Sequence, residues 1–517
     1  MSHVKQSQDA VFAFLASPAS HGGEKVVRID THGAAVFLAG DRVLKVKRAV
    51  KFPFLDYSTL AKRKAACEAE LEVNRPFAPQ IYRGVVPITR EASGKLAIGN
   101  KNVSSGEVVE WALEMARFDE KATLDHLADA NRIDDALADE LGRAVASAHD
   151  KAPVVEAARW IAALSDYIAQ NDAALREFGE LFAEEDIRIL TERSRSAFAT
   201  IRPLLESRGR LGLIRRGHGD LHLGNIVLLD GKPVLFDALE FDPVVASGDV
   251  LYDLAFLLMD LVERKLPKAA NLVFNRYLSE TAREADFDGL AALPLFLSVR
   301  AAIRAKVKAA KLENAKAGEK SAIEKSAQEY FTLATRLIAP PPPLLVAVGG
   351  LSGTGKSVLA RGLAPRLLPS PGAVVLRSDV MRKRLFGVGE TEKLPQEAYQ
   401  PEVTGRIYSA LAAQARRILA AGQCAVVDAV FAKDDERREI AALAKAAGLG
   451  FRGLFLTADL ATRIARVGAR VNDASDADEQ VVRKQAHYDL GEMDWTEVDA
   501  SGTPERTLAN ARTTLAQ

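Results

Sequence analysis

The sequence has little cysteine and no excess of either charge. Among 517 residues there are only two cysteines, Cys67 and Cys424, which lie far apart and form no metal-type spacing. We expect both to be reduced residues of a protein core. Lys plus Arg and Asp plus Glu both number 69, so the formal net charge is zero. This balance gives no support for a nucleic-acid partner or an acidic membrane surface.

Long apolar runs are also missing. No stretch reaches about 18 uncharged apolar residues, so no membrane-spanning helix is expected. The N-terminal residues lack a basic segment followed by an apolar run, so we expect no signal peptide and a cytoplasmic protein. A hydrophobic content of 48% and a charged content of 27% are ordinary for a soluble globular chain. The length predicts a multidomain protein of about two to four domains.

The clearest motif in the chain is a glycine-rich loop at 350–357, here called the phosphate loop. It fits G-x-x-x-x-G-K-[ST], in which backbone N–H groups wrap a di- or triphosphate, the Lys reaches its oxygens and the hydroxyl binds Mg²⁺. An apolar strand at 344–348 precedes the loop and an amphipathic helix follows, which favours a nucleotide site over a simple glycine turn. The predicted nucleotide-binding residues are Gly350, Ser352, Gly353, Thr354, Gly355, Lys356 and Ser357, and Ser357 is also a predicted Mg²⁺ ligand.

Four prolines at 340–343 mark the predicted domain boundary, because they favour a semi-rigid polyproline spacer. The chain before them, 1–339, should hold a mainly β lobe at about 25–118 and a helical lobe at about 119–339. After them, at 344–517, short apolar runs alternate with helical stretches, which predicts a parallel α/β sheet covered on both faces. Ligands should bind at the carboxyl ends of its strands. The apolar runs lie at 344–348, 373–376, 424–427 and 451–456.

A second segment with candidate catalytic residues spans 218–242, with the sequence HGDLHLGNIVLLDGKPVLFDALEFD. Two apolar runs in it are joined by Asp-Gly, a strong two-residue hairpin signal. Counting back from this turn places Asn225 opposite Phe236, one residue before Asp237. Asp220 lies five residues before Asn225. Three side chains that handle metals or protons are therefore predicted to converge at the open end of one hairpin.

The D-x-x-x-x-N spacing, the hairpin and the second Asp resemble the catalytic loop and metal-binding Asp of protein-kinase-like enzymes. The HGDLH…N form, with YDLAF at 252–256, is similar to the aminoglycoside phosphotransferases and their small-molecule kinase relatives. The resemblance covers about 25–335 and implies a bilobal protein-kinase-like α+β fold. It also implies that Asp220 is the catalytic base and that Asn225 and Asp237 hold Mg²⁺.

The same resemblance implies a Lys–Glu pair in the first lobe. Lys45 is preferred for the Lys, with Lys47 on the same strand face as the alternative. Glu70 is preferred over Glu68 for the Glu. The turn at 31–34 would cover the phosphates, although it has one Gly and departs from a full glycine-rich loop. Residues expected to be structural instead of catalytic are His218, His222 and Asp253.

After the phosphate loop, the apolar run 373–376 leads into an S-D-x-x-R segment. Taken alone, Asp379 of this segment could equally cap the following helix. The segment resembles P-loop kinases of the polynucleotide-kinase and zeta-toxin type. This resemblance implies that Asp379 is the general base and that Arg382 binds a substrate or nucleotide anion.

Two further features match that type of kinase. Asp428 ends the apolar run 424–427, where the second P-loop metal motif would stand, although it could merely cap a turn. Arg466 and Arg470 share one helical face and precede the polar run 472–478, an arrangement similar to a P-loop kinase lid. The resemblance implies that both arginines bind the transferring phosphate. A solvated surface helix is the alternative.

The sequence thus predicts two phosphotransferase domains in tandem, with two ATP sites and bound Mg²⁺. Each would transfer the γ-phosphoryl of ATP to a hydroxyl of a small molecule. Two alternatives stay open. One domain could bind ATP only to regulate the other, or the P-loop domain could act on a polynucleotide or a nucleotide sugar, with the zero net charge speaking against nucleic acid. No feature indicates an oligomeric state.

Overall fold

The computed structural model describes residues 8–52, 55–99, 106–240, 242, 244–470 and 473–515. These residues form two compact units, one within 1–164 and 209–257 and the other within 165–208 and 258–517. The second unit therefore contains residues on both sides of the proline run at 340–343. Within the described residues, no helix has the length and apolar character needed to cross a membrane.

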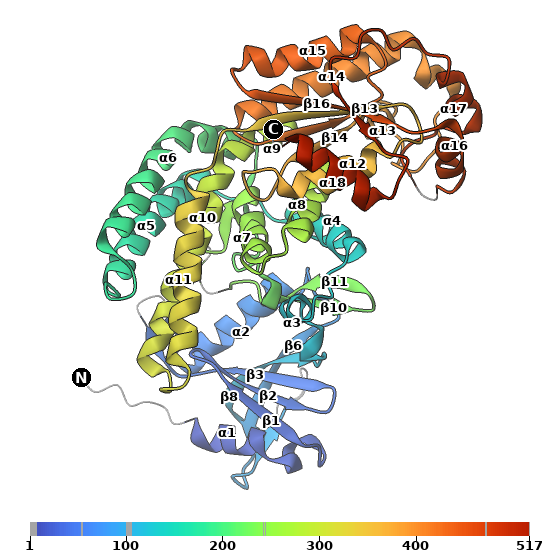
Figure 1. Ribbon diagram of the computed structural model, residues 1–517. Helices are drawn as coiled ribbons and strands as arrows, with labels where there is room; N and C mark the ends of the chain where they lie inside the picture. The colour runs from blue at the N-terminus through green and yellow to red at the C-terminus, as the bar shows by residue number, and fades with distance from the viewer. Residues whose placement is uncertain are drawn as a thin grey trace. The chain divides into compact units, whose positions relative to one another are not determined.

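An antiparallel sheet organises the start of the first unit (Figure 1), with strand order β1-β2-β3-β8-β6-β7. Helix α1 packs on one face against Leu44 and Val46, while α2 packs on the other face near Val43. Because side chains alternate along a strand, Lys45 and Lys47 share the α2 face with Val43. The elements are α1 (Asp9–Ala16), β1 (Val26–Asp30), β2 (Ala34–Ala39), β3 (Arg42–Lys47), β4 (Lys51–Phe52), β5 (Leu55–Asp56), α2 (Leu60–Asn74), β6 (Tyr82–Arg90), β7 (Leu96–Ile98) and β8 (Glu107–Ala116).

The predicted hairpin follows in the same unit. Strands β10 (Ile226–Leu229) and β11 (Lys232–Leu235) pair with Leu229 opposite Lys232, the register expected from the Asp-Gly turn. A second pair, β9 (Ile214–Arg216) with β12 (Ser247–Asp249), was not predicted because each strand is only three residues long. The helices from 119 to 263 are α3 (Leu124–Asp129), α4 (Asp135–Lys151), α5 (Ala157–Arg176), α6 (Glu184–Arg210) and α7 (Val250–Glu263).

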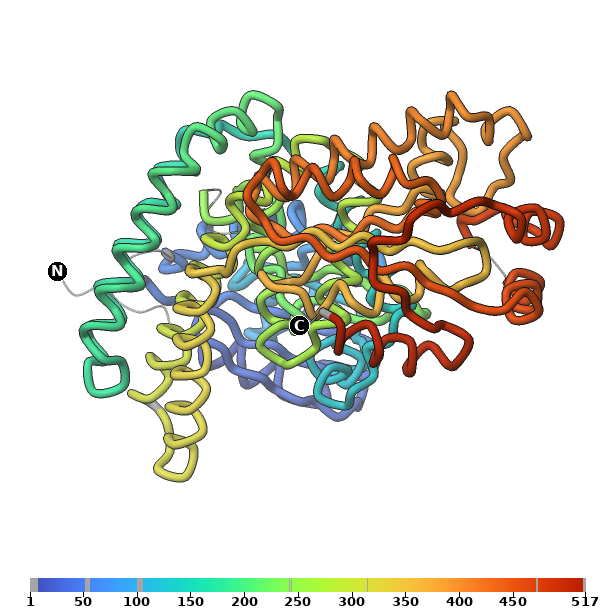
Figure 2. The backbone as a smooth tube through the Cα atoms, turned by 45° about the horizontal axis from the view of Figure 1, so that its top comes forward, coloured from blue at the N-terminus to red at the C-terminus, as the bar shows by residue number. Residues whose placement is uncertain are grey.

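Four more helices precede the proline run, in the second unit. Helices α10 and α11 lie side by side in both views (Figures 1 and 2), and the Ser298 hydroxyl donates to the Ala334 carbonyl at 2.9 Å. Their bounds are α8 (Pro267–Thr281), α9 (Glu284–Gly289), α10 (Leu293–Ala310) and α11 (Lys320–Leu337).

The predicted parallel sheet is confirmed, with order β14-β15-β13-β16-β17. Helices α12 and α18 cover one face and α14 and α15 the other (Figures 1 and 2). Strand β17 was not predicted, because its TEVD sequence buries only Val498. The bounds are β13 (Leu344–Gly350), α12 (Lys356–Leu363), β14 (Val374–Arg377), α13 (Ser378–Leu385), α14 (Pro401–Ala420), β15 (Ala425–Asp428), α15 (Asp434–Ala446), β16 (Gly450–Thr457), α16 (Leu460–Gly468), α17 (Glu479–Gln485), β17 (Thr496–Asp499) and α18 (Pro504–Leu515).

Candidate functional site

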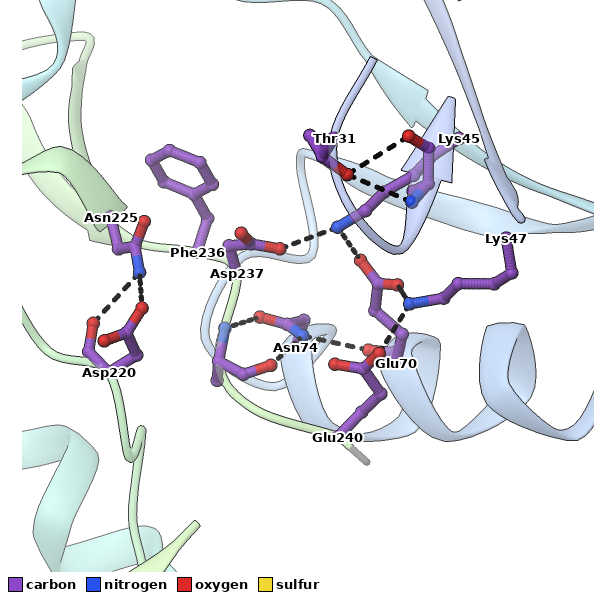
Figure 3. A network of polar contacts seen from close by, with 12 residues as sticks. Thr31, Lys45, Lys47, Glu70, Asn74, Asp220, Asn225, Phe236, Asp237 and Glu240 are labelled. Carbon is purple, nitrogen blue, oxygen red and sulfur yellow. Dashed lines mark hydrogen bonds and ion pairs between the residues drawn. The ribbon is translucent and has the colours of Figure 1, made fainter. Parts of the chain in front are cut away.

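The first site is built around Lys45, on β3 (Figure 3). Its Nζ lies 2.7 Å from Glu70 Oε1 and 2.8 Å from Asp237 Oδ1. Glu70 is fully buried on α2, whereas the Asp237 side chain is 46% exposed. The sequence-predicted Lys, Glu and second Asp therefore meet in one ion-pair cluster. Glu68 lies apart from the cluster and pairs with Lys64 at 3.3 Å.

Lys47 belongs to the same cluster. Its Nζ lies 2.6 Å from Glu70 Oε2 and 2.5 Å from Glu240 Oε1, and its side chain is only 4% exposed. The Tyr57 hydroxyl also donates to Glu240, at 3.1 Å. Each of the two lysines of β3 thus pairs with a different oxygen of the Glu70 carboxylate. Glu240 was missed from sequence, although its place three residues after Asp237 was an available signal.

Electrostatics keep this cluster ionised. Burial acts to raise the pKa of Glu70, but the charges of Lys45 and Lys47 outweigh it and lower that pKa to about 2. Burial likewise acts to lower the pKa of Lys45, but Asp237 and Glu70 outweigh it, and the pKa stands well above its usual range. At neutral pH the site therefore holds two charged lysines against the charged Glu70 carboxylate.

The loop that precedes β10 brings Asn225 beside Asp220. The Asn225 amide nitrogen donates to the Asp220 carbonyl and to its Oδ2, both at 3.0 Å. The Phe236 N–H donates to the Asn225 carbonyl at 3.0 Å, which places Asp237 next along the chain. The Asn225 amide oxygen faces away from Asp220 (Figure 3). An amide oxygen and the Asp237 carboxylate are hard oxygen donors that fit Mg²⁺ bound jointly with phosphates.

Helix α2 also holds the backbone around Asp237. Asn74, one helical turn after Glu70, accepts the Ala238 N–H at 2.6 Å and donates to the Ala238 carbonyl at 3.0 Å. The Asp237 N–H donates to the Tyr82 hydroxyl at 3.0 Å. Asp237 itself has a positive φ of 59°, so these bonds stabilise an uncommon backbone conformation. Asn74 was not predicted, because its partner is remote in sequence.

Asp253 anchors the loop that carries Asp220. Its carboxylate accepts the backbone N–H groups of His218 at 2.8 Å and Gly219 at 3.0 Å. The His218 ring contacts the Phe236 carbonyl at 2.8 Å, and burial lowers the pKa of His218, which favours the neutral ring. His222 Nδ1 accepts the Gly224 N–H at 3.1 Å. These contacts agree with the structural roles expected for the two histidines and Asp253.

The second site is the phosphate loop between β13 and α12. Gly353 has a φ of 87°, and a Cβ there would lie 2.5 Å from the Arg463 carbonyl oxygen, so only glycine fits. The loop ends at the N-terminus of α12, where backbone N–H groups favour an anion. Lys356 Nζ lies 3.3 Å from the Leu351 carbonyl, and burial lowers the pKa of Lys356. The Ser357 hydroxyl donates to Asp428 Oδ2 at 2.6 Å.

Arg377 contacts the pair expected to hold Mg²⁺. Its Nη2 donates to the Ser357 hydroxyl at 3.1 Å, and its Nε lies 3.4 Å from Asp428 Oδ2. Nη2 also lies 3.3 Å from Asp473 Oδ1. Burial acts to lower the pKa of Arg377, but the two carboxylates outweigh it and raise that pKa. Arg377 was missed from sequence, although it is the last residue of a strand whose carboxyl end faces the site.

A cavity of 1260 Å³ extends from the phosphate loop, and Asp379 and Arg382 both line it. Burial, and then the neighbouring Asp428, raise the pKa of Asp379, which makes its carboxylate a stronger proton acceptor. The Arg382 guanidinium lies 5.0 Å from the Tyr399 ring and 3.4 Å from the Thr404 hydroxyl. The structure thus places Arg382 at the wall of the cavity, where it also holds the start of α14.

Arg466 and Arg470 line the same cavity. Arg466 Nη2 donates to the Gly502 carbonyl at 2.8 Å, and its Nη1 lies 3.5 Å from the Thr354 carbonyl in the phosphate loop. Arg463, which is 4% exposed, donates to the Ser352 carbonyl at 2.9 Å. These contacts place α16 against the phosphate loop and disfavour the solvated-helix alternative.

The polar run 472–478 follows Arg470, and Asn472 lies outside the described residues. Asp476 in this run is tied down. It lies 2.6 Å from Lys383 Nζ, accepts the Tyr399 hydroxyl at 2.5 Å and accepts the Leu394 N–H at 3.0 Å. Lys383, next to Arg382, is 1% exposed and was not predicted. The run is therefore fastened to Lys383 of α13 and to Tyr399, which also lines the cavity.

In comparisons with known proteins, the residues of each site fall within a different family match. Residues 40–293 match the phosphotransferase enzyme family, and residues 345–488 match an AAA domain. An uncharacterized protein of Mycobacterium tuberculosis is 29% identical over 495 residues, which cover 93% of this chain and 94% of the relative. A protein of Mycobacterium bovis gives the same figures.

Two solved structures that are similar to parts of the chain are described as kinases. A gluconokinase from Sinorhizobium meliloti is 21% identical and covers 34% of this chain and 93% of its own, with a TM-score of 0.25. A choline kinase from Cryptosporidium parvum is 14% identical and covers 60% and 88%, with a TM-score of 0.37. The chain therefore holds a segment that matches the phosphotransferase enzyme family, followed by a segment that matches an AAA domain. The two matches agree with the tandem of kinase-type domains that the two resemblances predict.

Replacing each of the two lysines of β3 should have a different effect on stability and on Mg·ATP affinity. Lys45→Met leaves Glu70 paired with Lys47 and frees Asp237, whose side chain is 46% exposed, so we expect a smaller loss of stability than for Lys47→Met. Mg·ATP affinity at the first site should fall by roughly a hundredfold, because a cation that faces the phosphates is lost. Lys47→Met leaves Glu240 and one Glu70 oxygen buried without their cation, so the free energy of unfolding should fall by about 3 kcal/mol. Urea unfolding and Mg·ATP titration measure the two effects. Lys64→Met, at a side chain that is 43% exposed, is the control. If Lys45→Met and Lys47→Met lose stability and Mg·ATP affinity to the same extent, the assignment of Lys45 to the nucleotide and of Lys47 to the fold is wrong.

Gly353 offers a test of the phosphate loop. In Gly353→Ala the new methyl group meets the Arg463 carbonyl, and we expect a strain of about 2 kcal/mol, roughly thirtyfold in affinity. Mg·ATP affinity should fall at the second site and stay unchanged at the first. Gly318→Ala, where an added Cβ has open space, is the matched control. Unchanged affinity in Gly353→Ala would show that the loop does not bind the nucleotide.

Proposed function

We propose that the chain is a cytoplasmic, bifunctional ATP-dependent phosphotransferase. Each domain transfers the γ-phosphoryl of ATP to a hydroxyl of a small molecule. The observation that carries this proposal is the pair of separate, complete clusters. Lys45, Glu70 and Asp237 meet in the first domain, where Asn225 links Asp220 to the residue before Asp237. Ser357 meets Asp428 at the phosphate loop in the second domain.

In the first domain, Asp220 accepts the proton of the acceptor hydroxyl as it attacks the γ-phosphorus. Asn225 fixes the Asp220 carboxylate by the bond to Oδ2 and, with Asp237, is suited to hold Mg²⁺. Lys45 turns its charge to the nucleotide phosphates, while Lys47 keeps Glu70 ionised. When bound, Mg²⁺ neutralises the charge that develops on the transferring phosphoryl group.

In the second domain, Lys356 and the loop N–H groups hold the β- and γ-phosphates, and Ser357 with Asp428 is suited to hold Mg²⁺. Asp379, whose pKa is raised, accepts the proton of the acceptor hydroxyl. Arg466 and Arg470 neutralise the transferring phosphate, and Arg382 binds an anionic group. The cavity of 1260 Å³ is large enough for a nucleotide and a small acceptor together, which supports a small-molecule substrate.

The test separates the two activities. Wild type, Asp220→Ala and Lys356→Ala are incubated with γ-labelled ATP, Mg²⁺ and a metabolite extract, and labelled products are identified by mass spectrometry. We expect two classes of product, each lost by at least a hundredfold in one variant only.

The controls for this experiment are Asp41→Ala and Lys51→Ala, whose side chains are 89% and 69% exposed. Both should retain every product. If Asp220→Ala leaves all products intact, the first domain is not a kinase. If Lys356→Ala leaves them intact, the second domain is not one.

A further inference from the structure

Strand β14 stands at the edge of the parallel sheet, within the described part of the chain. It pairs with β15 on one side, and the backbone groups of its other side need partners from elsewhere. This strand matters for function, because Asp379 follows it directly at the start of α13. The groups that hydrogen-bond to the outer edge of β14 therefore influence the position of Asp379 in the second site.

The edge is completed by two asparagines of α8. Asn275 Oδ1 accepts the Val375 N–H at 2.7 Å, and Asn275 Nδ2 donates to the Ala373 carbonyl at 3.1 Å. One amide side chain thus supplies both the acceptor and the donor that a neighbouring strand would supply. Asn271, which is 3% exposed, donates to the Ala373 carbonyl at 3.0 Å and to the Pro371 carbonyl at 3.2 Å.

The fit around Asn271 is close. Gly372 has a φ of 106°, and a Cβ there would lie 2.6 Å from Asn271 Nδ2 and 2.5 Å from the Ala364 carbonyl oxygen. The segment before β14 therefore has the backbone that only glycine readily adopts, directly against the α8 side chain. Buried amide hydrogen bonds in such a tight contact are costly to break.

The same helix also holds α13 and the segment after it. Arg384, near the end of α13, donates from Nη2 to the Ser279 carbonyl at 2.8 Å and to the Ser279 hydroxyl at 2.6 Å. Glu390 accepts from the Ser279 hydroxyl at 3.0 Å and from Arg276 at 3.2 Å. Asn271, Asn275 and Ser279 are four residues apart, so they form one stripe along α8.

We propose that α8, although it lies within the phosphotransferase-family match, is a positioning element of the P-loop site. It fixes β14 through Asn271 and Asn275 and α13 through Ser279, and so sets the place of Asp379 against the phosphate loop. The second activity then requires the helix of the first domain. This inference rests on the proposed function of the P-loop domain.

The test uses the full chain and the variants Asn275→Leu and Asn275→Asp. The first keeps a similar volume without hydrogen bonds, while the second keeps the acceptor for Val375 and loses the donor to Ala373. Hydrogen exchange of the backbone at 374–385 should be about fivefold faster in Asn275→Leu and intermediate in Asn275→Asp. Exchange at β15 should not change. Asn510→Leu, at an exposed position of α18, is the matched control.

Activity gives the second measurement. In Asn275→Leu, formation of the Lys356-dependent product should lose about tenfold in kcat, with an unchanged KM for ATP, because Asp379 moves while the phosphate loop does not. The Asp220-dependent product should be unaffected. Unchanged exchange at 374–385, or faster exchange with unchanged kcat, would overturn the inference. The exchange measurement needs no turnover, so an inactive P-loop domain would be recognised separately.

Discussion

Buried charge must be neutralised within the protein, and this constraint shapes both sites. Glu70 is fully buried and stays ionised only because Lys45 and Lys47 each take one of its oxygens. In the second site, Arg377 lies against Asp428 and Asp473 in the same way. Both sites are therefore networks of paired charges. A nucleotide and a metal that bind there would replace some of these ion pairs with contacts of their own, instead of entering an uncharged cleft.

This arrangement separates residues that react from residues that keep the network intact. Lys45 contacts the half-exposed Asp237 and can turn toward a phosphate, whereas Lys47 contacts only buried or nearly buried carboxylates. Asn74 and Asp253 act on the backbone beside Asp237 and Asp220. Hydrogen bonds thus fix the backbone of the first site, whereas Lys45 and the half-exposed Asp237 are placed to contact substrate.

Much of this could be predicted from sequence, because the signals are local. The Asp-Gly turn determines the hairpin register, and that register alone brings Asn225 next to Asp237. Alternation along β3 places Lys45 and Lys47 on one face. The glycine pattern of the phosphate loop reflects backbone conformations that only glycine readily adopts, as at Gly353. The parallel character of the sheet in the second unit follows from its alternating strands and helices, whereas its strand order was not predicted.

The residues that were missed depend on contacts between distant parts of the chain. Asn74 contacts Ala238, Arg377 contacts Ser357, and Asn275 contacts Val375 about one hundred residues away. The Asn271–Asn275–Ser279 stripe was visible as polar residues at helical spacing, but its partner was not. The second compact unit includes residues on both sides of the proline run at 340–343, and contacts between distant segments, such as Asn275 with Val375, lie within it.

The proposed function requires two independent nucleotide sites in one chain. Calorimetric titration with a non-hydrolysable ATP analogue and Mg²⁺ counts these sites on wild type, Lys45→Met and Lys356→Ala. We expect two equivalents bound per wild-type chain and one in each variant. A single equivalent in the wild type, lost in only one of the two variants, would contradict it.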